Sequence, residues 1–184
     1  MARRMFDPDE SLLLVVDVQE RLWPHISNKD QVRDRCRILM EGARLLNVPF
    51  VVSEQYPKGL GPTLAELREC RTAETPLCTK NEFGCFANEA LAAEIEKPGR
   101  RQLVVCGIEA HVCVLQTVLS ALDRGFKVGV PADAVGSREE GNRQLALLRM
   151  RDAGAVALSS EMILFEWMGT ARHPAFKAVS QLIK

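Results

Sequence analysis

Short apolar runs alternate with longer stretches of helical periodicity along most of the chain, and this alternation constrains the fold more than any other feature. The runs are continuous and β-branched, which is typical of strands that are covered on both faces of a sheet. They occupy residues 11–16, 48–53, 102–106, 126–130 and 155–158. This order of elements predicts right-handed βαβ units and a parallel sheet between two layers of helices.

The stretches between the runs carry helix signals. Apolar residues in 32–46 recur at spacings of four and three, as on one face of an amphipathic helix. Ser137 and Glu140 have the spacing of a capping box, followed by Leu145 and Leu148, and Gly154 suits the position after that helix ends. We therefore expect an α/β fold with three αβα layers and a central, mostly parallel, doubly wound sheet of about six strands. No linker or repeat divides the chain, so we expect one domain over residues 1–184.

The composition excludes several classes of function. Lys+Arg and Asp+Glu both number 24, so the net charge is zero and the basic excess of a nucleic-acid or membrane-surface protein is missing. The first ten residues are too short and too acidic for a secretory signal, so we expect a cytoplasmic protein. Its six cysteines are then reduced thiols. They form no CxxC pair, which argues against a zinc ribbon or a thioredoxin-type site.

Three residues suited to nucleophilic catalysis follow predicted strands. Asp17 ends the first strand, Lys80 follows a short β-like run, and Cys113 lies where a strand gives way to a helix. Sites in open parallel sheets lie at the carboxyl ends of the strands, so we expect these side chains to meet. The helix start and Lys80 should favour a Cys113 thiolate, whereas the like charge of Asp17 opposes it, and first-turn N–H groups can hold an oxyanion. Asp17 would then serve as general base.

Each residue alone also has a simpler interpretation. A cysteine is often a small buried hydrophobic residue, an aspartate after a strand is often a helix cap, and a lysine is usually a solvated surface charge. Cys106, inside a predicted strand, is interpreted as such a packing residue. Only the combination of acid, cation and thiol points to an enzyme.

Three segments in order, LLLVVDVQE, KNEFGCF and GIEAHVCV, resemble the isochorismatase-like cysteine hydrolase superfamily. Other segments, such as SEQYPKGLGPT, resemble its isochorismatase domain-containing branch. The resemblance implies that Asp17, Lys80 and Cys113 form the catalytic triad. It also implies a cis peptide bond between Ile108 and Glu109, and an oxyanion hole made by the N–H groups of Glu109 and Cys113.

The same resemblance bears on metals and on the reaction. Nicotinamidase-type relatives hold a metal through an Asp-x-His motif and further histidines, but residues 54–57 here contain no histidine. His25, His111 and His173 are scattered, whereas metal ligands cluster, so we expect neither a metal nor another cofactor. True isochorismatases lack the cysteine and cleave a vinyl ether with the acid, and the presence of Cys113 disfavours that reaction.

The sequence thus predicts a hydrolase that cleaves an amide, ureide or carbamoyl C–N bond of a small molecule through a thioester on Cys113. Asp17 would be the acid/base, and Lys80 would stabilise charge. The alternatives are a catalytically silent thiol redox or binding protein, a scaffold, and, less favoured, a vinyl ether hydrolase.

The pocket walls and partners are predicted less directly. Trp23, Tyr56 and Phe83 either line the substrate pocket or cover edges of the core, and His111 either contacts substrate or faces solvent. Members of the resembling family are commonly homo-oligomers, and zero net charge opposes association little, so we expect a dimer or higher oligomer. We expect no nucleic-acid or membrane partner.

Overall fold

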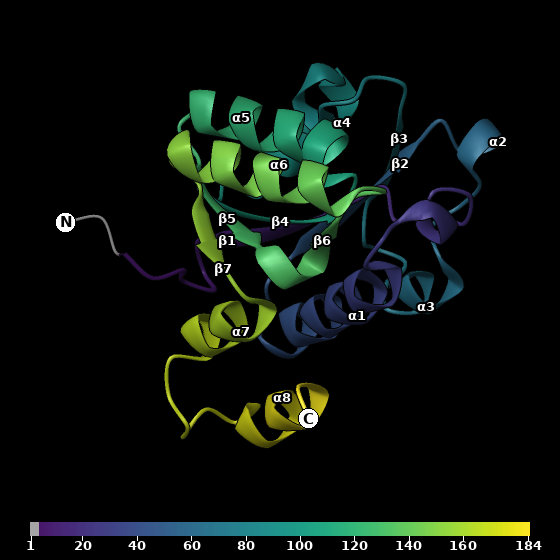
Figure 1. Ribbon diagram of the computed structural model, residues 1–184. Coiled ribbons are helices and arrows are strands. Elements are labelled where there is room, and N and C mark those ends of the chain that lie inside the picture. Colours follow the sequence, from purple (N-terminus) through teal and green to yellow (C-terminus); the bar gives the residue numbers. More distant parts are fainter. Residues whose placement is uncertain (1–3) are drawn as a thin grey trace.

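The computed structural model describes residues 4–184 and contains a parallel seven-stranded sheet between two layers of helices (Figure 1). The strand order is β3-β2-β1-β4-β5-β7, and β6 pairs with β4. This confirms the predicted doubly wound α/β fold. The strands are β1 (Ser11–Val16), β2 (Phe50–Gln55), β3 (Leu77–Lys80), β4 (Gln102–Ile108), β5 (Lys127–Pro131), β6 (Val135–Gly136) and β7 (Val156–Leu158). The seventh strand, beyond the six expected, is the two-residue β6, which is too short to leave a sequence pattern.

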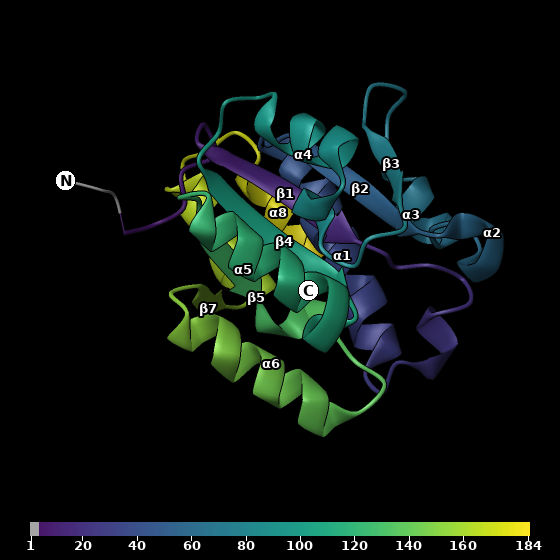
Figure 2. The same ribbon diagram turned by 90° about the horizontal axis from the view of Figure 1, so that it is seen from above.

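Helices cover both faces of the sheet (Figures 1 and 2). One layer contains α4 (Glu89–Glu96), α5 (Leu115–Asp123) and α6 (Glu140–Asp152), and the other contains α1 (Lys29–Leu45), α7 (Ser160–Met168) and α8 (Phe176–Leu182). Two single-turn helices, α2 (Pro57–Leu60) and α3 (Ala65–Arg68), follow β2. A π-helical turn, η3 (Ala110–Val114), joins β4 to α5. No helix in residues 4–184 is long and apolar enough to cross a membrane.

Strand β1 shows how the sheet divides two cores. All six of its residues are buried. Leu13 and Val15 pack into the core beneath α1 and α7, while Leu12, Leu14 and Val16 pack into the core beneath α4 and α5. A strand that is buried on both faces has no polar face, so the sequence of residues 11–16 shows no alternation of apolar and polar residues.

Gly107 lets β4 approach β1 closely at the edge where Asp17 follows. Its φ is +114°, a backbone region that favours glycine, and a Cβ built there would lie 2.1 Å from the carbonyl oxygen of Val16. The ladder pairs Val16 with Gly107. A glycine is therefore required where the ends of the two central strands meet.

The predicted start of α6 is wrong, although its predicted end is correct. The helix begins at Glu140 with Glu139 as N-cap, and Ser137 makes no capping bond. The Ser137 Oγ lies 3.0 Å from Nδ1 of His111 instead. Gly154 follows the helix with φ +111°, as expected of a C′ glycine.

Candidate active site

The three predicted catalytic residues all lie at the carboxyl edge of the sheet. Asp17 follows β1, Lys80 is the last residue of β3, and Cys113 lies in the π-helical turn after β4. In the sheet, β2 separates β3 from β1, and β4 is the other neighbour of β1 (Figure 2). The strand order thus brings an acid, a lysine and a thiol together from segments far apart in the sequence.

Asp17 and Lys80 form a fully buried ion pair. Lys80 Nζ lies 2.6 Å from Asp17 Oδ2, and both side chains are 0% exposed. Burial lowers the pKa of the Lys80 ammonium, but the charges and the hydrogen bond of its neighbours, Asp17 foremost, raise that pKa by more, so that it lies above its ordinary value. Lys80 is therefore an ammonium at neutral pH, and its charge balances the buried carboxylate.

Two side chains from β2 complete the shell around this pair. The Ser53 hydroxyl donates to Asp17 Oδ1 over 2.7 Å, and Lys80 Nζ also donates to Gln55 Oε1 over 2.7 Å. Each oxygen of the Asp17 carboxylate thus has its own donor. Sequence reasoning missed both β2 residues. The one available signal is that Ser53 ends the predicted strand 48–53 and Gln55 stands two residues later, on the same side of the observed strand.

Cys113 is a neutral thiol in the resting protein, which is the state that a general-base role for Asp17 requires. The residue is 7% exposed. Burial, followed by the charge of Asp17, raises the pKa of the Cys113 thiol far above its ordinary value, and Lys80 offsets this only in part. A hydrogen bond between the thiol and the Asp17 carboxylate raises the pKa further. A thiol that is hydrogen-bonded to a carboxylate suits proton transfer during attack rather than a preformed nucleophile.

A second thiol and a threonine hold the segment around Cys113. Thr117 Oγ1 donates to the carbonyl oxygen of Cys113 over 2.6 Å, and it accepts from the backbone N–H of Cys85 over 3.0 Å. The Cys85 thiol lies 3.9 Å from the Ser53 hydroxyl. Cys106, by contrast, is fully buried within β4 among apolar side chains. These contacts join Cys113 to the same buried network as Asp17.

The segment between β4 and Cys113 begins with a cis peptide bond between Ile108 and Glu109. The Glu109 carboxylate accepts from the backbone N–H of Arg138 over 2.9 Å and from its Nη2 over 2.7 Å. Burial raises the pKa of Glu109, but the contacts with Arg138 outweigh it, so the pKa lies below its ordinary value. The Glu109 side chain is thus ionised and engaged with Arg138, which leaves its backbone N–H as the group of interest for the site.

The four candidate pocket residues have different surroundings. Trp23 is half-buried against the core and donates from Nε1 to the carbonyl of Lys29 over 3.0 Å, so it is in part a core-edge residue. Tyr56 is 53% exposed and, with Lys80, lines a hollow of about 270 Å³. Phe83 is 55% exposed. His111 is half-buried, with its ring held by Ser137.

The residues at the place of the metal motif in nicotinamidase-type relatives do not fit a metal. Glu54 Oε1 accepts from both the N–H and the hydroxyl of Thr63, over 2.6 and 2.8 Å, and Gln55 Oε1 accepts from Lys80. Among residues 4–184 no group of three or more His, Cys, Asp or Glu side chains is placed to hold an ion. The absence of a metal remains a prediction, for which a test is given below.

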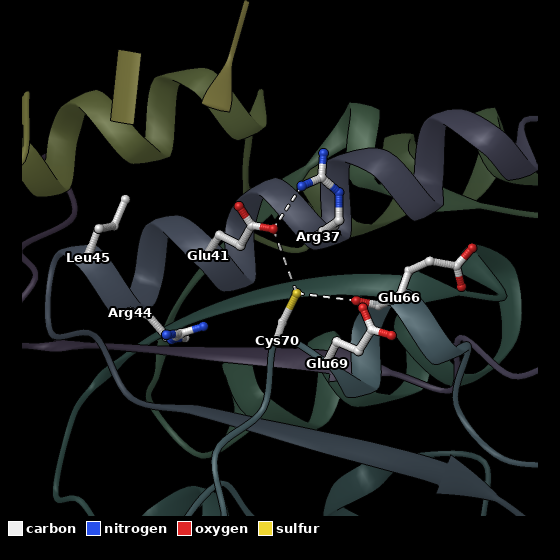
Figure 3. A pocket seen from close by; sticks show the side chains of 7 residues that line it. All are labelled: Arg37, Glu41, Arg44, Leu45, Glu66, Glu69 and Cys70. Atoms are coloured by element: carbon white, nitrogen blue, oxygen red, sulfur yellow. Dashed lines mark hydrogen bonds and ion pairs between the residues drawn. The ribbon is translucent and has the colours of Figure 1, made fainter. Parts of the chain in front are cut away.

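A larger hollow of about 510 Å³ lies elsewhere, between α1 and the segment around α3 (Figure 3). Its charged groups largely engage one another: Arg37 pairs with Glu41 at 2.7 Å, and the Cys70 thiol lies 3.4 Å from the carbonyl of Glu66. Burial and the Glu41 carboxylate raise the pKa of the Cys70 thiol. The thiol also lies 4.0 Å from Glu41 Oε1, and we assign no chemistry to this hollow.

Comparison with known proteins identifies the family of the chain. The Isochorismatase domain matches residues 11–162. The chain is 40% identical over 177 residues to "Isochorismatase domain-containing protein 1" of Salmo salar, which covers 96% of this chain but only 62% of that protein's length.

Two solved structures superpose closely. The MAR1 ribonuclease from Caenorhabditis elegans superposes with a TM-score of 0.92 and 38% sequence identity. The match covers 97% of this chain and 92% of the ribonuclease chain. The YcaC gene product from Escherichia coli, described as an octameric hydrolase of unknown specificity, superposes with a TM-score of 0.93 and 25% sequence identity. The match covers 100% of this chain and 91% of the YcaC chain. Family match, sequence identity and fold agree, and the chain belongs to the isochorismatase family.

Proposed function

We propose that the protein is a cysteine hydrolase that cleaves an amide, ureide or carbamoyl C–N bond of a small molecule through a thioester on Cys113. The observation that carries this proposal is the buried Asp17–Lys80 ion pair beside the Cys113 thiol. A buried ion pair is costly to desolvate and is weak as a stabilising device, so its position next to a thiol favours a chemical role. Lys80 balances the charge of Asp17, and Asp17 is the acid/base.

The reaction balances with these groups alone. As Cys113 Sγ forms a bond to the substrate carbonyl carbon, Asp17 takes the thiol proton and the carbonyl electron pair moves to oxygen. The N–H groups of Glu109 and Cys113 are the proposed donors to that oxyanion. When the C–N bond breaks, Asp17 gives the proton to the leaving amine. Water then attacks the thioester, Asp17 takes a water proton, and the acid product leaves as the Cys113 thiol is restored.

The experiment is a search for the covalent intermediate. The purified protein is mixed with a panel of amides, ureides and carbamoyl compounds and quenched in acid, and the intact mass is measured, followed by peptide mapping. We expect an acyl adduct on Cys113 that hydroxylamine removes and that Cys113→Ala never forms. An adduct on another cysteine, or turnover by Cys113→Ala, would show that the nucleophile is assigned wrongly.

The alternatives make different demands on the same residues. A redox sensor or binding protein has no need of a proton-transferring acid, and a scaffold needs none of the three. A vinyl ether hydrolase uses the acid without a thiol.

One similar structure is named a ribonuclease, so RNA belongs in the substrate panel. With a net charge of zero, we keep a small molecule as substrate, and Cys113-dependent RNA cleavage would overturn that choice.

We also propose that the single hydrolase domain works in the cytoplasm as a homo-oligomer. The similar YcaC protein is described as octameric, and the net charge of zero opposes self-association little. Light scattering at micromolar concentration should give a mass of at least twice that of one chain, and a monomer would contradict the proposal.

A further inference from the structure

We propose that Ser53 is a positioning residue for Asp17, an inference that rests on the proposed hydrolase function. Ser53 is fully buried in β2, the strand that lies between those of Asp17 and Lys80. It holds Asp17 at two points: its carbonyl oxygen accepts from the Asp17 N–H over 3.1 Å, and its hydroxyl donates to Asp17 Oδ1 over 2.7 Å. No other β2 side chain reaches that carboxylate among the hydrogen bonds of residues 4–184.

Asp17 needs such a support because its own backbone does not favour its position. Its φ is +53°, in the left-handed region that non-glycine residues seldom occupy, although aspartate tolerates it better than most. The other donor to the carboxylate, Lys80, sits at the end of a four-carbon side chain with several rotatable bonds. Ser53 has one rotatable bond and stands on a central strand, so it fixes the carboxylate plane more firmly than Lys80 alone can.

The surroundings of Ser53 direct its hydrogen toward Asp17. The Cys85 thiol donates to the Ser53 oxygen over 3.9 Å, which leaves the serine hydrogen for the carboxylate. Burial and the charge of Asp17 raise the pKa of Cys85 to about 11, so this thiol keeps its proton at neutral pH. The result is a directed chain from Cys85 through Ser53 to Asp17. A buried serine hydroxyl without a hydrogen-bond partner would destabilise the fold relative to alanine, because its desolvation would not be compensated.

The arrangement has a consequence for the reaction. With one oxygen bound by Ser53 and the other by Lys80, the carboxylate cannot rotate without breaking both bonds, so it is held in place to accept the Cys113 proton. A donor to the charged form also favours that form. Removing the hydroxyl should therefore slow acylation of Cys113, and should move the acid side of the pH–rate profile to higher pH.

Two matched comparisons test this with p-nitrophenyl acetate as the acyl donor. Ser53→Thr and Ser53→Val have nearly the same shape and differ in the hydroxyl, while Ser53→Ala is compared with the wild type in case the larger residues fit badly. The rate of p-nitrophenolate release and the acetyl adduct on Cys113 are followed across pH. We expect Ser53→Thr to stay within about threefold of the wild type. Ser53→Val and Ser53→Ala should be about tenfold to hundredfold slower, the range for a hydrogen bond to a charged group, with the acid side shifted upward.

Equal rates and equal pH profiles for the threonine and valine variants would overturn the inference, as would a profile whose acid side does not move. A purely structural role would lower the unfolding midpoint of the variants without moving the pH profile. Failure of the proposed function looks different: the wild type would form no acetyl adduct on Cys113, or Cys113→Ala would release p-nitrophenolate as fast as the wild type.

Discussion

Asp17→Asn should destabilise the fold as well as slow the reaction, because it leaves the Lys80 ammonium buried without its counter-charge. Both side chains of the pair are 0% exposed, and N and O lie 2.6 Å apart. Breaking a buried pair by removing one partner costs about 3–5 kcal/mol. In a chain of this size that corresponds to a drop of roughly 6–20 °C in the midpoint of thermal unfolding. Turnover should fall by about 10²–10⁴-fold, as expected for loss of a positioned acid/base.

The pH dependence of the free energy of unfolding tests the role of the ion pair more specifically than the size of the stability loss does. In the wild type Asp17 helps raise the pKa of Lys80, so the stabilisation from this pair is present below the unfolded lysine pKa of about 10.4 and is lost as pH rises through the folded value. In Asp17→Asn the burial of Lys80 remains and lowers its pKa, so the unfolded state binds more protons. The free energy of unfolding of the variant should therefore increase with pH between about 7 and 10.

Urea unfolding of four proteins measures both effects: the wild type, Asp17→Asn, Lys80→Met and the double variant. The double variant removes both charges, so it should lose less stability than Asp17→Asn alone. The reasoning is refuted if Asp17→Asn lies within about 1 kcal/mol of the wild type at neutral pH, or if its free energy of unfolding does not rise between about pH 7 and 10.

Three further predictions use other parts of the structure. Cys113→Ala should abolish acylation with little change in unfolding midpoint, whereas Cys106→Ala should keep acylation and lose about 1 kcal/mol by denaturant unfolding, because Cys106 is fully buried. Gly107→Ala should yield little folded protein by circular dichroism, since its Cβ would lie 2.1 Å from the oxygen of Val16. Elemental analysis should find no stoichiometric zinc, iron or manganese, and chelation should leave turnover intact; a metal lost together with activity would contradict this.

The candidate site shows what sequence patterns can predict. Asp17, Lys80 and Cys113 each lie at or after the carboxyl end of a strand, and the rule that sites lie at strand carboxyl ends is enough to group them. Ser53 was missed because its role depends on a partner 36 residues away in a neighbouring strand. The protonation state of Cys113 could not be predicted for a related reason: the helix start and Lys80 favour the thiolate, Asp17 opposes it, and the extent of burial, which only the folded chain determines, adds to the effect of Asp17.

In the fold, too, some features could be predicted from sequence patterns and others could not. The bounds of β1 were predicted at both ends because polar residues flank a continuous apolar run. Strand β2 begins and ends two residues later than predicted, and Glu54 and Gln55 pair with β3 although they are polar. On α6 the leucines do not mark the packed face: Leu145 and Leu148 are 67% and 45% exposed, while Ala146 and Met150, spaced four apart, face the core. Leucines spaced by three do not reveal which helix face packs, because other apolar residues define a competing face.

The neutral state of Cys113 also helps to decide between the proposed hydrolase and a redox protein. Oxidation requires an accessible thiolate, and a sensor cysteine accordingly has a lowered pKa and an exposed sulfur. Cys113 has the opposite property, because burial and Asp17 raise its pKa. A base-coupled nucleophile needs no resting thiolate, because Asp17 accepts the proton as the bond to carbon forms. The buried acid, its balancing ammonium and a protected thiol thus fit a nucleophile that is generated at the moment of attack, and this arrangement favours hydrolysis over redox sensing.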